Sequence, residues 1–211
     1  MSANTVVLTL PEFVPAQPKN LPAVFATQTE RYMAIKAYDA LGSGEVEYRR
    51  MIGEAVGSFI DEDRWNFDQV EIGLLNVAVF DPRLLGEFYA KVGGVTRHID
   101  PDECANYEGV LTPGGVYVAQ FQMGKMHPDT KPCDFRVNHN PLEQGMTVKE
   151  GLNVLALGGS GFLKVCYSDL SGSSSPDGGV PCLSLDVGKP YLAAYTDGNA
   201  DPCYGSASRG S

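Results

Sequence analysis

Turn-forming dipeptides divide the second half of this chain into short segments, and this pattern restricts the folds that the chain can adopt. From Val95 onward, pairs such as Pro113-Gly114, Asn140-Pro141 and Asp177-Gly178 separate runs that are rich in β-branched and aromatic residues. The chain holds 24 glycines and 14 prolines among 211 residues, which favours many turns over long helices. Short strands at this spacing are typical of a β-sandwich, a jelly roll or a small barrel. We therefore expect residues 95–211 to form an antiparallel β-rich domain of the sandwich or jelly-roll type.

Several segments of this region have the composition of strands. They cover residues 115–123, 134–137, 152–157, 162–167, 182–187 and 191–195. The Ser/Gly-rich stretch 171–179 lies between two of them and is expected to be an exposed loop.

The first part of the chain has a different pattern, which predicts an extended arm followed by helices. Four prolines between residues 11 and 22 exclude a helix there, so residues 1–22 are expected to be the arm. Apolar residues recur at helical spacing in 23–41 and again in 45–60, with Gly42-Ser43-Gly44 between them. This arrangement predicts a helical hairpin, and residues 23–94 are expected to be mainly helical. The fold class is therefore predicted to be α+β.

Two further segments of the helical region carry local signals. Residues 70–80 form an apolar run that fits a buried helix or a buried strand. Asp81-Pro82 is a typical N-cap followed by proline, which predicts a short helix that ends at Gly93-Gly94.

Charge and hydropathy narrow the choice of partners and location. The formal net charge is −10, and a phosphate-rich surface would repel so acidic a chain, so we expect no nucleic-acid partner. No segment approaches the roughly 18 continuous apolar residues of a membrane-spanning helix, so no membrane partner is expected either. The first residues do not match a secretory signal, which predicts a protein made in the cytoplasm.

The two cysteines that flank the Ser/Gly-rich stretch are candidates for a disulfide. Residue 174 is midway between Cys166 and Cys182. In a symmetric hairpin the two cysteines would face each other, with Cα atoms about 4.5 Å apart in a non-hydrogen-bonded pair. That distance is near the short limit for a disulfide. Two interpretations stay open, a disulfide or two buried thiols on one face of a sheet.

A short acidic stretch near residue 200 is the best candidate for a metal site. Asp197, Asn199 and Asp201 stand at alternate positions, which is how calcium loops present their oxygen ligands. An EF-hand would have glycine and glutamate where this chain has Pro202 and Ser208. The stretch therefore predicts either a calcium site outside the EF-hand class or an ordinary turn. No other cofactor is expected.

Other reactive residues lack the spacing that catalysis or zinc binding needs. No Cys-x-x-Cys or His-x-x-x-His pair supports a zinc site among the cysteines and His98, His127 and His139. Cys133 and His139 would be about 20 Å apart along one strand, too far for a thiol and its base to hydrogen-bond. We therefore expect no enzymatic activity and nominate no catalytic residue.

These observations favour a structural role in a large protein assembly. The arm, the helical hairpin and an odd number of cysteines suit a capsid, decoration or connector subunit of a virion or phage particle, whose partners are copies of itself and other subunits. The alternative is a calcium-assisted ligand- or carbohydrate-binding β-module. In that case Tyr191, Tyr195 and Tyr204 would stack on a sugar.

Overall fold

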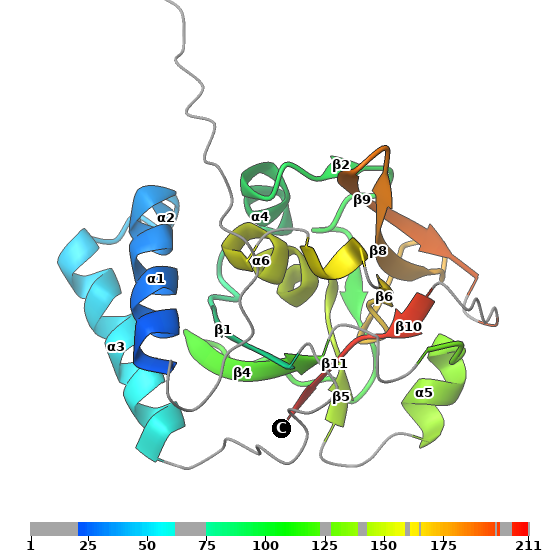
Figure 1. Ribbon diagram of the computed structural model, residues 1–211, viewed down its shortest axis with the longest axis horizontal. Helices are drawn as coiled ribbons and strands as arrows, with labels where there is room; N and C mark the ends of the chain where they lie inside the picture. Colours follow the sequence, from blue (N-terminus) through cyan, green and yellow to red (C-terminus); the bar gives the residue numbers. More distant parts are fainter. Residues whose placement is uncertain are drawn as a thin grey trace, which may run out of the picture.

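The computed structural model describes residues 21–61, 75–122, 128–138, 143–158, 161–164, 166–196, 198 and 204–210 (Figure 1). The predicted arm lies outside these residues except for Leu21 and Pro22, which begin the first helix. Within the described part of the chain, no helix is long and apolar enough to cross a membrane.

The predicted helical hairpin is present and forms one side of the molecule (Figure 1). It consists of α1 (Leu21–Ala34), the short α2 (Ala37–Ala40) and α3 (Glu45–Asp61). Phe25 of α1 meets Phe59 of α3 edge to face, with ring centroids 6.0 Å apart. Tyr32 and Tyr48 form a second such pair at 5.9 Å. Aromatic contacts of this kind hold the two antiparallel helices together.

A four-stranded sheet follows the hairpin, and all of its pairings are antiparallel. Its order is β1 (Leu75–Phe80), β4 (Tyr117–Gln122), β11 (Ser208–Gly210) and β5 (Glu143–Gly145). The apolar run that fitted either a helix or a strand is therefore a strand at residues 75–80. Since β1 pairs with β4, the predominantly helical region supplies a strand to the β-rich region.

A five-stranded sheet forms the other side, and it mixes parallel and antiparallel pairs. Its order is β10 (Tyr204–Ser206), β6 (Tyr167–Asp169), β8 (Val180–Asp186), β9 (Lys189–Tyr195) and β2 (Thr96–Arg97). The β8–β9 hairpin is antiparallel, whereas β10 runs parallel to β6 and β2 runs parallel to β9. A mixed α+β class is thus confirmed, but a purely antiparallel sandwich or jelly roll is not.

Helices also occur inside the β-rich region, where three strands were predicted. They are α5 (Pro132–Asn138), α6 (Val148–Gly158) and the 3-10 helix η3 (Gly161–Lys164), whereas α4 (Gly86–Val92) belongs to the region that was predicted to be mainly helical. The predicted strand at 134–137 lies in α5, the one at 152–157 lies in α6, and residues 162–164 lie in η3. These three strand predictions are wrong.

The helix α6 was mistaken for a strand because it is buried on all sides. It lies between the helical hairpin and the five-stranded sheet (Figure 1), and its residues 148–157 are buried except for the half-buried Lys149. Residues 152–157 are apolar except for Asn153, and so short an apolar run does not distinguish a strand from a buried helix. Gly151 lets the sheet approach closely, since a Cβ there would lie 2.7 Å from the Cδ2 atom of Leu170. A single hydrophobic core therefore joins the helices to both sheets.

Candidate functional site

Four tyrosines on the outer face of the five-stranded sheet form the most distinctive surface feature, which we call the tyrosine cluster. Its members are Tyr167, Tyr191, Tyr195 and Tyr204, from β6, β9 and β10. Strand register brings them together, because Tyr204 lies opposite Tyr167 and Ser184 of β8 lies opposite Tyr191. Side chains alternate between the two faces of a strand. The tyrosines therefore point away from Leu183 and Leu192, which belong to the buried core.

The rings and hydroxyl groups of the cluster contact one another. Tyr204 meets Tyr167 and Tyr195 edge to face, with centroids 5.0 Å and 5.4 Å apart. The hydroxyl of Tyr195 lies 3.3 Å from that of Tyr191 and 3.1 Å from that of Tyr204. His98, which follows β2, packs edge to face on Tyr191 at 5.6 Å. Tyr195 is 43% exposed, so the cluster presents aromatic surface to solvent.

The contacts within the cluster shift the pKa values of its tyrosines. The neighbouring Ser184 hydroxyl lowers the pKa of Tyr191 most, and the contact with the Tyr195 hydroxyl lowers it further. The hydrogen bond to Tyr191 raises the pKa of Tyr195 to about 12. Burial, followed by the hydrogen bond to Tyr195, raises the pKa of Tyr204. In both contacts of the row either hydroxyl can be the donor.

Small polar side chains lie beneath the tyrosines on the same face of the sheet. Cys182, Ser184 and Ser206 are all fully buried there. Ser184 lies close enough to affect the pKa of Tyr191, although its Oγ makes no hydrogen bond of standard geometry with the described residues. The tyrosines and this row of small side chains give the sheet an outer face that is covered by aromatic rings.

The predicted pairing of Cys166 with Cys182 is not observed. Strand β6 pairs with β8 so that Asp169 lies opposite Cys182, and no disulfide joins the two cysteines in the described residues. The thiol of Cys182 instead points to the Ala193 carbonyl oxygen at 3.6 Å, and burial raises its pKa.

The register differs because the Ser/Gly-rich stretch is not the symmetric exposed loop that we expected. Residues 170–173 are buried, and β7 (Ser173–Ser174) pairs with β3 (Ala105–Asn106). The Ser173 hydroxyl also accepts a hydrogen bond from the Val148 amide at the start of α6, at 3.0 Å. The chain between the cysteines therefore passes through the interior before it reaches β8, which shifts the pairing of the two strands.

The predicted calcium ligands Asp197, Asn199 and Asp201 lie outside the described residues, as do His127 and His139. Within the residues that are described, no group of three or more histidine, cysteine and acidic side chains could hold a metal ion.

Cys104 is a poor nucleophile at neutral pH, because burial and the neighbouring carboxylates of Asp100 and Asp102 raise its pKa to about 11.

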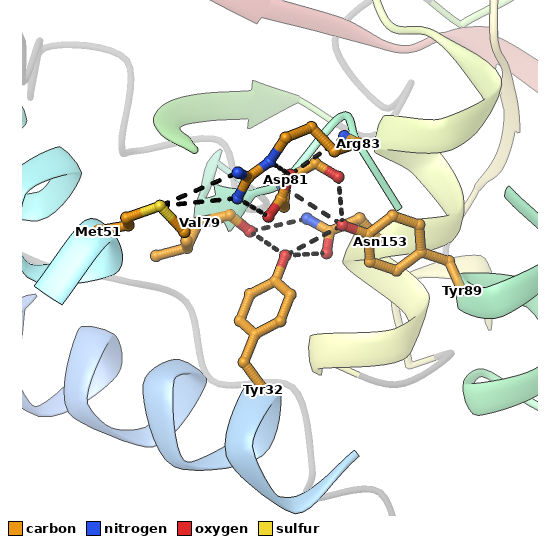
Figure 2. A network of polar contacts seen from close by, with 7 residues as sticks. All are labelled: Tyr32, Met51, Val79, Asp81, Arg83, Tyr89 and Asn153. Atoms are coloured by element: carbon orange, nitrogen blue, oxygen red, sulfur yellow. Dashed lines mark hydrogen bonds and ion pairs between the residues drawn. The ribbon is translucent and has the colours of Figure 1, made fainter. Parts of the chain in front are cut away.

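A second polar cluster is buried where α1, β1, α4 and α6 meet (Figure 2). The Tyr32 hydroxyl lies 2.8 Å from the Asn153 Oδ1 atom and 3.0 Å from the Val79 carbonyl oxygen, which also accepts from the Asn153 amide at 2.9 Å. The Tyr89 hydroxyl donates to the Asp81 carbonyl oxygen at 2.8 Å. These side chains are fully buried, so the network stabilises the junction of the four elements rather than facing a ligand.

The same cluster includes an ion pair at its outer end (Figure 2). Arg83 binds the fully buried carboxylate of Asp81 through two nitrogens, at 2.9 Å and 2.7 Å. The predicted N-cap is partly right, because Asp81 also accepts the Arg83 amide, but the helix that follows begins only at Gly86.

A third polar cluster fixes the start of α6. Thr147 and Glu150 form a capping box, in which Glu150 accepts the Thr147 amide at 2.7 Å. The buried Glu150 carboxylate also accepts the Tyr117 hydroxyl at 2.5 Å and pairs with Arg209 at 3.2 Å. We did not identify this cluster from the sequence, although the pattern Thr-x-x-Glu before an apolar run is a recognised signal for a helix start.

A scan of the chain against protein-family models finds no match, and neither do searches of curated proteins and of solved structures.

Proposed function

We propose that this chain is a structural subunit of a larger protein assembly, such as a virion or phage particle, and has no catalytic activity of its own. The observation that carries the proposal is the outer side of α3. Val46 and Ile60 are 83% and 49% exposed there. They are 14 residues apart, close to four helical turns, so they lie on the same side of the helix. Exposed apolar side chains gathered on one helix face are typical of a contact surface.

Two glycines on that side of α3 support the proposal. Gly53 and Gly57 lie between Val46 and Ile60, and a Cβ at either position would meet nothing within 4 Å. Glycine inside a helix costs about 0.5–1 kcal/mol relative to alanine. The fold of a single chain does not need glycine at these two positions. A helix from a neighbouring subunit that packs closely against α3 would need the space that the missing side chains leave. The partners would be copies of this chain or other subunits of the assembly.

Native mass spectrometry and light scattering test the proposal. We expect oligomers that grow with protein concentration and with salt, because salt screens the repulsion between chains of net charge −10. Val46→Asp should shift the mass towards the monomer. Val187→Asp is the matched control, since Val187 is 97% exposed in the β8–β9 turn, away from α3. A wild-type chain that stays monomeric at high concentration and high salt would overturn the proposal.

The second candidate function is a calcium-assisted carbohydrate-binding module. It is favoured by the position of Tyr195 and Tyr204, which are neighbours in space and flank the segment that holds Asp197, Asn199 and Asp201. Bound calcium would stabilise the folded chain and raise its melting temperature. We expect this rise to be lost in Asp201→Asn and kept in Asp186→Asn. No rise at millimolar calcium would exclude the calcium site.

A further inference from the structure

We propose that the tyrosine cluster binds a neutral pyranose sugar directly, without a metal ion. The inference uses the same tyrosines as the second candidate function, but it depends neither on calcium nor on assembly. It rests on the hydroxyl groups, the exposed rings and the local charge.

The hydroxyl groups of Tyr191, Tyr195 and Tyr204 leave a donor for a ligand. Each phenol has one proton to donate and two lone pairs to accept with. The two contacts within the row, at 3.3 Å and 3.1 Å, use two of the three protons. One proton is left over, whichever hydroxyl of each pair donates. The row therefore offers one donor and several lone pairs, which suits a ligand whose own hydroxyls both donate and accept.

The exposed rings supply the apolar part of the contact. Tyr195 is the most exposed member, and its edge-to-face packing on Tyr204 holds its ring in place. A fixed aromatic ring presents a large contact area and loses little conformational entropy when a ligand binds. One face of a pyranose ring consists of C–H groups, and these can lie against such a ring while the sugar hydroxyls reach the phenols.

The local charge favours a neutral ligand. The charged cross-strand pair at the end of the β8–β9 hairpin is Asp186 and Lys189, whose charges are opposite. Among the described residues, the exposed side chains of the cluster are phenols and the imidazole of His98, and the carboxylate of Asp169, opposite Cys182 on the same face, is buried. Charged sugars and nucleotides therefore fit this surface less well than neutral glycosides do.

Saturation-transfer NMR tests the inference with methyl glycosides of glucose, galactose and mannose at millimolar concentration, in buffer that contains EDTA. We expect transfer to the ring protons of at least one glycoside. Tyr195→Ser should abolish it, and Tyr191→Phe, which keeps the ring and loses one hydroxyl of the row, should weaken binding about three- to tenfold. Tyr107→Ser is the matched control, because Tyr107 is 41% exposed and lies outside the cluster. Circular dichroism checks that each variant is folded.

Three outcomes would overturn the inference. They are no transfer to any of the glycosides, equal transfer in the wild-type chain and in Tyr195→Ser, and transfer that requires calcium. The last of these would assign sugar binding to the second candidate function instead. Val46→Asp changes α3 and leaves the tyrosine cluster intact. Assembly and sugar binding are therefore tested by different substitutions, and either proposal can fail while the other holds.

Discussion

The side-chain amide of Gln28 takes the place of a neighbouring strand beside Val79. Its Oε1 atom accepts the Val79 amide at 2.8 Å, and its Nε2 atom donates to the Val77 carbonyl oxygen at 2.7 Å. These are the two groups that an adjoining strand would bind at an edge of a sheet. In the described sheet β1 pairs only with β4, so α1 covers the other edge of β1 through Gln28 and through Tyr32, whose hydroxyl binds the Val79 carbonyl oxygen. An edge covered in this way is protected from pairing with another chain.

Gln28→Glu should destabilise the protein by about 1–3 kcal/mol, because a carboxylate cannot donate to the Val77 carbonyl oxygen and leaves it unpaired. Urea unfolding measures the change. Thr27→Ala is the control, since the Thr27 hydroxyl makes only an exposed contact within α1, to the Ala23 carbonyl oxygen. Equal losses in the two variants would show that the Gln28 amide does not support β1.

Glycine-to-alanine substitutions in two helices should have opposite effects on stability. Gly53→Ala fills open space on α3 and should stabilise the monomer by about 0.5–1 kcal/mol. Gly151→Ala places a methyl group 2.7 Å from the Leu170 side chain. The resulting overpacking should destabilise the monomer by about 1–3 kcal/mol. Thermal unfolding at low protein concentration distinguishes the two. A stabilising Gly151→Ala would contradict the close approach of α6 to the sheet.

Arg209 and Glu150 should be strongly coupled, because both side chains are buried. Arg209→Met leaves the Glu150 carboxylate without its cation, and losing one partner of such a pair costs about 3–5 kcal/mol. Glu150→Gln keeps the capping box, which glutamine also supports, but leaves the buried Arg209 without an anion, with the Gln144 side chain and the Leu111 carbonyl oxygen as its remaining hydrogen-bond partners. We expect the double variant to be more stable than the sum of the single losses predicts. Additive losses in a double-mutant cycle would contradict the coupling.

Asp102 should make the protein more stable above pH 4 than below it. Burial tends to raise the pKa of this carboxyl, but the amides of Glu87 and Gly86 and the ammonium group of Lys149 outweigh burial and lower it. A group whose pKa is lowered on folding stabilises the protein above its unfolded pKa, about 3.9 for aspartate. That contribution is lost as the pH falls through the lower folded value.

Asp102→Asn should therefore flatten the dependence of stability on pH in the acid range. Denaturant unfolding at a series of pH values measures the slope, and Asp186→Asn is the control because Asp186 is exposed at the β8–β9 turn. An unchanged acid slope in Asp102→Asn would show that the two amides do not hold the carboxylate.

Local patterns predicted the hairpin α1–α3 and the strands β4, β8 and β9, because their apolar periods follow directly from the sequence. The pattern failed for α6, because the short apolar run 152–157 fits a strand as well as a buried helix, although Thr147 and Glu150 marked the start of the helix. The strand register at Cys182 failed for a different reason, since the segment before β8 pairs with distant residues of β3.

The tyrosine cluster could be predicted only in part. Tyr191 and Tyr195 share a face because they are four positions apart on one strand. The contact of Tyr204 with Tyr167, and that of His98 with Tyr191, depend on parallel pairing between strands that are remote in sequence. Local periodicity in the sequence does not predict pairing between remote strands. Tyr167 and His98 were therefore not identified as neighbours of the other tyrosines.

The four-stranded sheet also has a consequence for how the chain folds. Its strand β11 lies between β4 and β5, and the hydroxyl of Ser208 reaches the Gln122 side chain across 86 residues of sequence. Closing so long a loop costs entropy before the contact is made, and proteins rich in distant contacts fold slowly. The helical hairpin needs only contacts between near neighbours. In a refolding experiment, helical circular dichroism should therefore recover before the sheet that joins β4 to β11.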